Sequence, residues 1–272
     1  MLPAVKVLAL DVGGTSVKSA LVSNGALLGE VRRTPIPSQH SAPEILGAFA
    51  EIIAAYPEAE ALALAFPGPF DYASGVCRIQ GLQKFGSLYG LNLAEALSGG
   101  RPIRFCNDAE AAIVGEARYG VGVGFTRLLG ITLGTGLGSA FLVEGSPVVS
   151  GPGVPPNGWL YSQPVGGGIA DETFSIRGLK RRAEEAGLPT TEPGDIQDAA
   201  FWRAFGSDLG RFLSPFVQAF GAEAVLVLGG VSGAFPLFGE ALGLALSRVE
   251  AHPGQLAGGA PLLGAAALFK PS

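Results

Sequence analysis

Apolar residues in the first part of the chain form short runs separated by polar turns, a pattern typical of buried strands. The strands predicted from these runs cover residues 5–10, 19–22, 27–34, 61–65 and 102–106. Residues 43–56 lie between the third and fourth strands and are predicted to form a helix, with Ser41 as a candidate N-cap and Pro43 near its first turn.

The rest of the chain continues the alternation of strands and helices. The stretch "NDAEAAIVGEARYG" predicts a helix that begins at Asn107 or Asp108 and ends near Gly120. Residues 127–143 are predicted to form two strands joined by a glycine-rich turn, and "AVLVLGGVSGAF" a buried strand that ends in a glycine pair. Further helices are predicted at residues 174–186, 199–220, 241–249 and 261–269. Strands alternating with helices indicate the α/β fold class.

One hairpin motif occurs twice. "LALDVGGTSVKSALV" at residues 8–22 aligns with "LGITLGTGLGSAFLV" at residues 129–143 when one residue is gapped. In both stretches an apolar strand enters a Gly/Thr turn and leaves through Ser-Ala into a second apolar strand. Self-similarity at this long spacing suggests two related halves, although two glycine-rich hairpins can also look alike by chance.

Composition and charge narrow the class of protein. The 272 residues are 48% hydrophobic and 15% charged, which fits a globular chain of one large domain or two ordinary ones. The net charge of −5 gives no indication of binding to nucleic acid or to an anionic membrane, which attract positively charged proteins. Two apolar runs without charge, residues 128–143 and 224–239, are too short to span a membrane and are broken by glycine.

Signals for export and for disulfide bonds are sparse. The first residues lack the basic region, long apolar core and cleavage site of a signal peptide. Cys77 and Cys106 are the only cysteines, too few for a disulfide framework or a Cys-rich metal site. We therefore expect a cytoplasmic protein.

The turn of the first hairpin, "DVGGTSVK", has the residue types of an anion-binding loop. Gly13 and Gly14 permit positive φ and a close approach of free backbone amides to an anion. Thr15 adds a hydroxyl, Lys18 a positive charge, and Asp11 a carboxylate suited to Mg²⁺, directly or through water. A plain hairpin turn explains the glycines but not a charged residue at the end of an apolar strand. The pattern therefore favours a functional loop.

Two more glycine-rich turns follow strands. The loop "TLGTGLGS" presents further backbone amides and hydroxyls, from Thr132, Gly134, Thr135 and Gly136. In "LGGVSGA", Gly229 and Gly230 let a flat ligand lie against the backbone, or form only a tight turn. Neither "DVGGTSVK" nor "TLGTGLGS" contains an intact dinucleotide-binding or P-loop signature, so neither class is supported.

The stretch "FCNDAEAA" places Asp108 just after a strand and at the start of a helix. Asn and Asp are common N-caps, and capping alone accounts for a polar residue here. A carboxylate at this edge can also accept a hydroxyl proton as a general base, a role typically worth about 10²–10⁴ in rate.

These segments, together with "FPGPFD", occur in the order and spacing of the ROK family of sugar kinases, and the resemblance covers nearly the whole chain. It implies the actin-like ATPase (ribonuclease H-like) fold, with two related α/β domains around a cleft. By this resemblance the first domain covers residues 1–107, with a C-terminal helix at about 258–272 packed back on it, and the second covers 108–257.

The resemblance also implies roles for individual residues. The first phosphate loop comprises Asp11, Gly13, Gly14, Thr15 and Lys18, with Asp11 holding Mg²⁺. The second phosphate loop comprises Gly134, Thr135 and Gly136, with Thr132 at its start. Gly229 and Gly230 border the adenosine of ATP. Gly68, Asn107 and Asp108 face the sugar, and Asp108 is the general base.

The chain departs from the family pattern in one segment. After the second phosphate loop, ROK kinases usually carry a Gly-Glu-x-Gly-His motif and a Cys-rich zinc motif, whereas residues 151–169 contain neither His nor Cys. No zinc site is therefore expected, and the usual sugar contacts are missing. Asn157 is the candidate for a sugar contact in this segment. The remaining polar candidates in and just after it are Tyr161, Asp171 and Glu172.

The predicted function is an ATP-dependent, glucokinase-like sugar kinase, with a small sugar as its partner and no nucleic acid or membrane. In-line attack of a sugar hydroxyl on the γ-phosphate would follow proton removal by Asp108. Polyphosphate is an alternative phosphoryl donor. The resemblance to the family also implies a homodimer. The alternative functions are a non-enzymatic sugar or nucleotide sensor and an ATPase without a sugar substrate.

Overall fold

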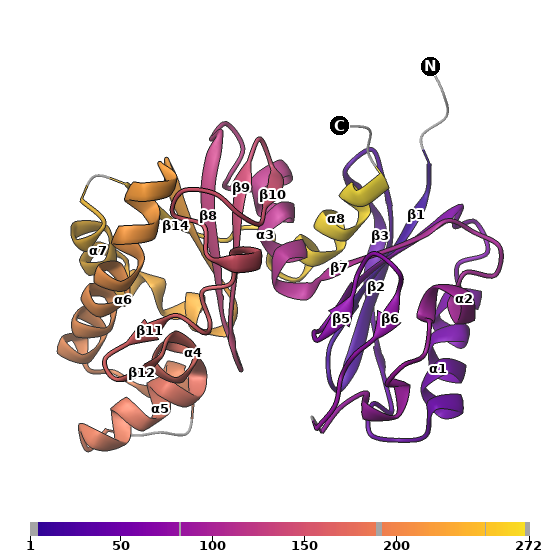
Figure 1. The fold of residues 1–272 in the computed structure, drawn as a ribbon, viewed down its shortest axis with the longest axis horizontal. Coiled ribbons are helices and arrows are strands. Elements are labelled where there is room, and N and C mark those ends of the chain that lie inside the picture. Colours follow the sequence, from indigo (N-terminus) through magenta and orange to yellow (C-terminus); the bar gives the residue numbers. More distant parts are fainter. Residues whose placement is uncertain (1–4, 82, 189–191, 248, 270–272) are drawn as a thin grey trace. The chain divides into compact units, whose positions relative to one another are not determined.

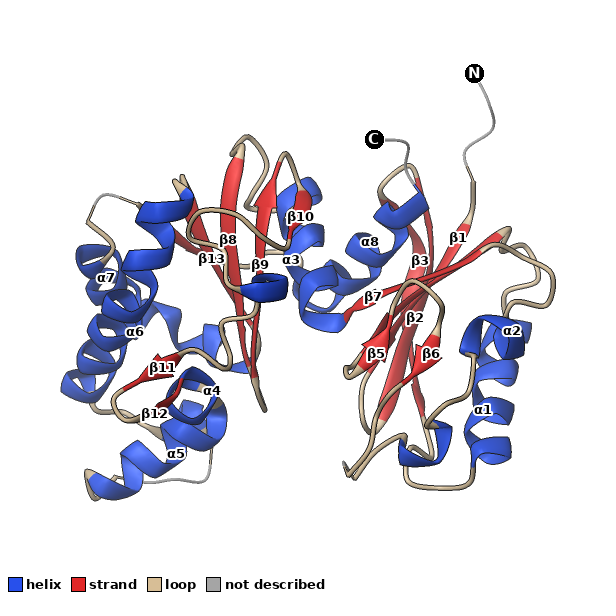
Figure 2. Ribbon diagram, viewed as in Figure 1, coloured by secondary structure: helices blue, strands red, loops and turns tan. Residues whose placement is uncertain are grey.

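The computed structural model describes residues 5–81, 83–188, 192–247 and 249–269, and it divides into two compact units (Figures 1 and 2). Unit 1 consists of Met1–Gly115 and Ala257–Ser272, and unit 2 of Glu116–Leu256. The division falls inside helix α3 (Asp108–Tyr119). The predicted domain boundary at 107/108 stays a prediction.

Unit 1 is built on a mixed five-stranded sheet. Across the sheet, the strands are β3 (Ala26–Pro35), β2 (Ser16–Ser23), β1 (Val7–Val12), β4 (Ala61–Phe66) and β7 (Ile103–Asn107). The first three are antiparallel neighbours, whereas β1, β4 and β7 run parallel. The three parallel strands therefore end at one edge of the sheet.

Helices cover both faces of this sheet. Helix α1 (Ala42–Ala54) begins after Ser41, whose amide donates to the Glu44 carboxylate at 3.0 Å. Its apolar side packs with Leu8 and Leu10 in the core of unit 1. Helix α8 (Ala260–Ala266) packs on β1, β2 and β4 from the opposite face (Figure 1). The remaining elements are β5 (Phe70–Asp71), β6 (Val76–Cys77) and α2 (Leu93–Leu97).

Unit 2 contains a second mixed sheet. Across it, the strands are β10 (Ser146–Val148), β9 (Leu137–Val143), β8 (Arg127–Leu133), β13 (Ala224–Leu228) and β14 (Glu250–Pro253). The first three are antiparallel, and β8, β13 and β14 are parallel. This is the strand order and direction of unit 1, so the repeated hairpin occupies equivalent places, β1–β2 and β8–β9, in two sheets of one topology.

The helices of unit 2 lie mostly where the periodicity predicts them, with two differences. Helix α6 (Ala199–Phe220) matches its predicted range and packs on α7 (Phe235–Ala245). The predicted helix at 241–249 is wrong in its limits, because Pro236 lies in the first turn of α7 and the helix ends at Ala245.

The predicted helix at 174–186 is divided in two. Helix α4 (Ala170–Phe174) ends before α5 (Ile176–Glu185), because Ser175 between them is extended at φ −70° and ψ 169°. The small hairpin β11 (Pro164–Val165) and β12 (Gly168–Ile169) precedes α4.

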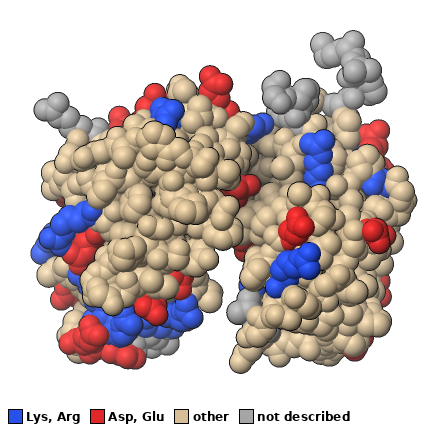
Figure 3. All heavy atoms as spheres, viewed as in Figure 1, with Lys and Arg blue, Asp and Glu red and all other residues tan. Residues whose placement is uncertain are grey.

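The two sheets and their helices confirm the predicted α/β class. Within the described ranges, no helix has both the length and the apolarity needed to cross a membrane. Acidic and basic side chains are interspersed on the face drawn in Figure 3.

Candidate active site

The polar segments of unit 1 meet at the carboxyl edge of its parallel strands. Strand β1 runs into the turn of the first hairpin, β4 leads toward Gly68, and β7 ends next to Asp108. The register pairs Asp11 with Ala65 and Phe66 with Asn107. In open α/β sheets this edge is where ligands bind.

Asn107, and not Asp108, caps helix α3. The Oδ1 atom of Asn107 accepts hydrogen bonds from the amides of Ala109 at 3.0 Å and Glu110 at 3.1 Å. Asp108 accepts only from the adjacent amide of Ala109, at 2.9 Å, within the described part of the chain. The capping role that the sequence left open therefore belongs to Asn107, and the second carboxylate oxygen of Asp108 stays available for another contact.

The electrostatic surroundings of Asp108 favour its protonated form. Burial raises the pKa of this carboxyl above its ordinary value, and the nearby charge of Asp11 adds to the rise. The Ala109 amide and the ammonium group of Lys84 act in the opposite direction without cancelling it. A carboxylate with a raised pKa is a stronger base than an exposed one.

Tyr72 connects the ends of β4 and β7. Its hydroxyl donates to the carbonyl of Phe66 and accepts from Nδ2 of Asn107, both at 3.1 Å. A Cβ on Gly68 would lie 3.3 Å from this hydroxyl. Burial raises the pKa of Tyr72, so its hydroxyl keeps its proton. Tyr72 is not predicted from the sequence, because its place directly after "FPGPFD" is its only local signal.

The first loop is closed by its own hydrogen bonds. Asp11 faces Lys18 across the β1–β2 ladder, and their side chains form an ion pair at 3.0 Å. The amide of Gly13 donates to the carbonyl of Ser16 at 3.0 Å. The expectation of a free amide at Gly13 is therefore wrong, because this bond closes the turn. Among the described residues, nothing accepts from the amides of Gly14 and Thr15.

The second loop joins β8 to β9 in unit 2 and is braced by the segment that follows β12. The amide of Leu137 donates to Oδ1 of Asp171 at 2.7 Å, and the amide of Ile176 donates to the carbonyl of Gly134 at 2.9 Å. Arg177 binds the other oxygen of Asp171 at 2.6 Å. Asp171, a candidate sugar contact, is thus occupied in supporting the loop.

The tip of the second loop is exposed. The amide of Gly134 donates to the carbonyl of Gly136 at 3.0 Å. The amides of Thr135 and Gly136 have no acceptor within the described residues. Thr132 lies in the β8 ladder, opposite Gly138 and Leu228. The loop therefore presents two amides that can bind an anion.

The two glycines after β13 have different surroundings, closely packed at Gly229 and open at Gly230. Gly229 has φ 90° and ψ −179°, and a Cβ there would lie 2.8 Å from the carbonyl carbon of Leu133 and overlap its oxygen. This glycine lets β13 end against β8, beside the second loop. At Gly230 the nearest atom to a Cβ would be Cδ1 of Ile176, at 3.8 Å, so its surroundings are open.

The divergent segment 151–169 is anchored at its centre. The hydroxyl of Ser139 donates to the carbonyl of Gly158 at 2.7 Å and accepts from the amide of Leu160 at 2.9 Å. Asn157 has a left-handed backbone with φ 60° and is exposed. Trp159 and Tyr161 form an exposed aromatic pair, with ring centroids 5.8 Å apart.

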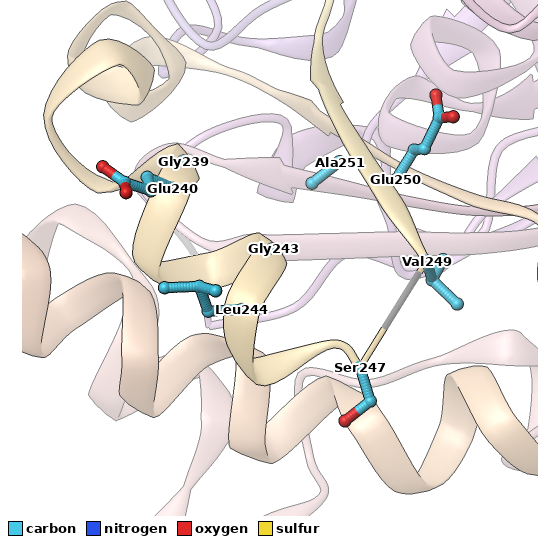
Figure 4. A pocket seen from close by; sticks show the side chains of 8 residues that line it. All are labelled: Gly239, Glu240, Gly243, Leu244, Ser247, Val249, Glu250 and Ala251. Atoms are coloured by element: carbon cyan, nitrogen blue, oxygen red, sulfur yellow. The ribbon is translucent and has the colours of Figure 1, made fainter.

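The structure brings the predicted residues together in two groups. Unit 1 holds the first loop, Gly68, Asn107 and Asp108, and unit 2 holds the second loop, the glycine pair and Asn157. A pocket of unit 2 between α7 and β14 contains none of them; Figure 4 shows it, with Glu240 and Glu250 as its charged residues.

In the part of the chain that the structure describes, no group of three His, Cys, Asp or Glu side chains is placed to hold a metal ion. The statement that the chain lacks a zinc site remains a prediction from its sequence.

Comparisons with known proteins agree on one family. The sequence model of the ROK family matches residues 7–271. A beta-glucoside kinase of Klebsiella pneumoniae is 26% identical over 249 residues, which is 83% of this chain and 82% of that protein.

Two solved structures cover almost the whole chain. The inorganic polyphosphate/ATP-glucomannokinase of Arthrobacter sp. strain KM is 30% identical, with a TM-score of 0.71, covering 96% of this chain and 97% of that one. The ROK hexokinase of Thermus thermophilus is 26% identical, with a TM-score of 0.78 and 96% of each chain covered. The fold is that of ROK kinases, as the resemblance predicted.

Proposed function

Because the chain belongs to the ROK family, we propose that it is an ATP-dependent sugar kinase in which Asp108 is the general base. The observation that carries this proposal is that Asn107, and not Asp108, caps helix α3. Asn107 supplies the cap, so the Asp108 carboxylate, which accepts only from the Ala109 amide among the described residues, keeps its second oxygen for another contact at the strand edge. A partly buried carboxylate with a raised pKa at this edge suits proton removal from a hydroxyl.

Each unit contributes one phosphate loop in this proposal. The amides of Gly14 and Thr15 in unit 1, and of Thr135 and Gly136 in unit 2, suit phosphate oxygens because the protein leaves them without acceptors. We assign the adenosine to the open surroundings of Gly230 and to Gly229 beside it.

The first loop also fits a magnesium ion. Asp11 gives one carboxylate oxygen to Lys18, and no described residue hydrogen-bonds the other oxygen. Asp11 would hold Mg²⁺ directly or through water, and the ion would supply neutralisation of the phosphate charge. Lys18 holds the carboxylate in place for this role.

The chain's own residues then carry out a small number of tasks. Asp108 accepts the proton of the attacking sugar hydroxyl, and Asn107 and Gly68 lie beside it at the same strand edge. Tyr72 fixes the Asn107 side chain through its hydroxyl. Positioning and charge neutralisation supply most of the rate in phosphoryl transfer, so the protein needs no covalent intermediate.

The proposed acceptor is a hexose, with glucose first, because the relatives are named for glucosides, glucose and mannose or as a hexokinase. Polyphosphate is a second donor to test, because the Arthrobacter relative is a polyphosphate/ATP enzyme. A contact of Asn157 with the sugar, the homodimer and the cytoplasmic location stay predictions.

The test is a kinase panel with ATP and polyphosphate against glucose, mannose and a β-glucoside. We expect sugar-dependent release of ADP, and a loss of about 10²–10⁴ in kcat for Asp108→Asn. Asp198→Asn is the matched control, because this N-cap of α6 accepts from the Phe201 amide and Asn caps equally well.

The alternatives give different results in the same panel. A full rate in Asp108→Asn removes this residue as the base. Nucleotide and sugar binding without turnover in the wild type indicates a sensor, and ADP release that needs no sugar indicates an ATPase.

A further inference from the structure

Lys84 is a cation at the first phosphate loop that neither the motifs nor the proposed function use. It lies in the connection between β6 and the short 3₁₀ helix Gly86–Leu88. A Cβ on Gly14 would lie 3.2 Å from Cδ of Lys84, so the stem of the lysine rests against the backbone of the loop. The side chain is partly buried there.

The neighbouring residue holds Lys84 in this place. Phe85 has a left-handed backbone with φ 57°, although its ring is fully buried and contacts Phe66 at 5.2 Å between centroids. This conformation is costly for a bulky residue and persists where the surroundings fix it. The amide of Phe85 donates to the carbonyl of Ser38 at 2.6 Å, and the hydroxyl of Ser38 donates to the carbonyl of Gly14. The Lys84 backbone and the loop are therefore tied together through Ser38.

The two lysines of this region differ in their partners. Lys18 is neutralised by Asp11 at 3.0 Å. No described carboxylate lies within 4.0 Å of the Lys84 ammonium, although its charge reaches Asp108 and lowers the pKa of that carboxyl against the larger effect of burial. Lys84 is thus an uncommitted positive charge that lies against the Gly14 loop and acts electrostatically on Asp108.

We propose that Lys84 binds the phosphoryl group that is transferred and neutralises its charge during transfer. This rests on the proposed function. In the step, the sugar oxygen bonds to phosphorus as the bond from phosphorus to the bridging oxygen of the donor breaks, and the hydroxyl proton passes to Asp108. Lys84 donates a hydrogen bond to an oxygen of the transferred group. A lysine suits this position because its ammonium is a compact point charge with three donors.

Equilibrium binding separates this contact from a general effect on the loop. We compare ADP with AMPPNP, which carries the third phosphate, and add tripolyphosphate as a nucleotide-free probe, each with Mg²⁺. For Lys84→Met, the Kd of AMPPNP should rise about 10- to 100-fold more than that of ADP, the cost of one charge-assisted hydrogen bond. Tripolyphosphate should weaken similarly. Lys84→Arg should recover most of the affinity, and Lys6→Met, an exposed lysine of the same unit, should change nothing.

The pH dependence of kcat/KM distinguishes the competing role, in which Lys84 acts only on Asp108. The charges that face Asp108 are Lys84 and Asp11, so removing Lys84 raises the pKa of Asp108 and moves the acid limb to higher pH. If Lys84→Met moves the acid limb of kcat/KM to higher pH but leaves the ratio of AMPPNP to ADP affinity as in the wild type, the proposal is overturned. Lys84 is then a positioning residue that acts through Asp108. A wild type that discriminates AMPPNP through Lys84 but phosphorylates no sugar refutes the kinase function and keeps the phosphate contact.

Discussion

Replacing Gly229 with alanine tests how the end of β13 supports the second loop. The backbone there, at φ 90° and ψ −179°, is in a region that only glycine occupies without strain, so the new side chain costs about 1–3 kcal/mol. The added Cβ also overlaps the Leu133 carbonyl, at the end of β8, for about another 1–3 kcal/mol. We therefore expect a loss of about 2–6 kcal/mol in the free energy of unfolding.

Thermal unfolding and ADP binding measure the two consequences. At about 2–4 °C per kcal/mol, the Tm should fall on the order of 10 °C. Because the displaced Leu133 leads directly into the second loop, ADP affinity should fall as well. Gly230→Ala is the matched control for stability, since its Cβ would meet nothing nearer than 3.8 Å. Equal Tm values for Gly229→Ala and the wild type would refute the reasoning from the close approach of β13 and β8.

Three further predictions concern the charged and hydroxyl groups of the two units. The raised pKa of Asp108 means that its ionised form is disfavoured in the native protein, so kcat/KM should begin to fall at a higher pH than an exposed Asp would give. For the same reason, Asp108→Asn should raise the Tm at pH 7. A pH–rate profile whose acidic side has the pKa of an exposed Asp contradicts this prediction. Asp171→Ala leaves the Leu137 amide without its acceptor, so urea unfolding should show a free energy of unfolding lower by about 1–3 kcal/mol, and ADP should bind more weakly. Unchanged ADP affinity would contradict the claim that Asp171 supports the second loop. Tyr72→Phe removes the hydroxyl that orients Asn107, so the KM for the sugar should rise while the Kd of ADP stays constant; a change in ADP binding alone would contradict the assignment.

Much of the fold was predictable because strands and turns are local. The repeat of residues 8–22 at 129–143 predicted two related halves, and both copies form the same hairpin at the same place in sheets of equal strand order. Alternation of apolar runs sufficed for this, since each central strand is buried on both faces. The limits of α7 were harder, because Pro236 begins a helix directly after the glycine turn and the apolar pattern alone does not show where the turn ends.

The site was predictable only where a residue carries its own signal. Asp108 was recognisable as a charged residue directly after an apolar strand, and the two loops as glycine-rich turns after apolar strands. Tyr72 and Lys84 did not, because their importance comes from contacts with residues distant in the sequence. The role of Asp171 was likewise hidden, since the loop that it supports lies 34 residues earlier in the chain.

The return of α8 to unit 1 has a consequence for how the protein is made. Residues 260–267 are buried against β1 and its neighbours, and Gly264 packs against the backbone of Ala111 on α3. During synthesis, the sheet of unit 1 leaves the ribosome long before the helix that covers it, while all of unit 2 emerges in between as one continuous stretch. Unit 2 can therefore complete its core during translation, whereas the first loop and Asp108 gain their full packing support only after α8 has been released. A chain truncated just before Ala260 should consequently lose activity while unit 2 stays folded.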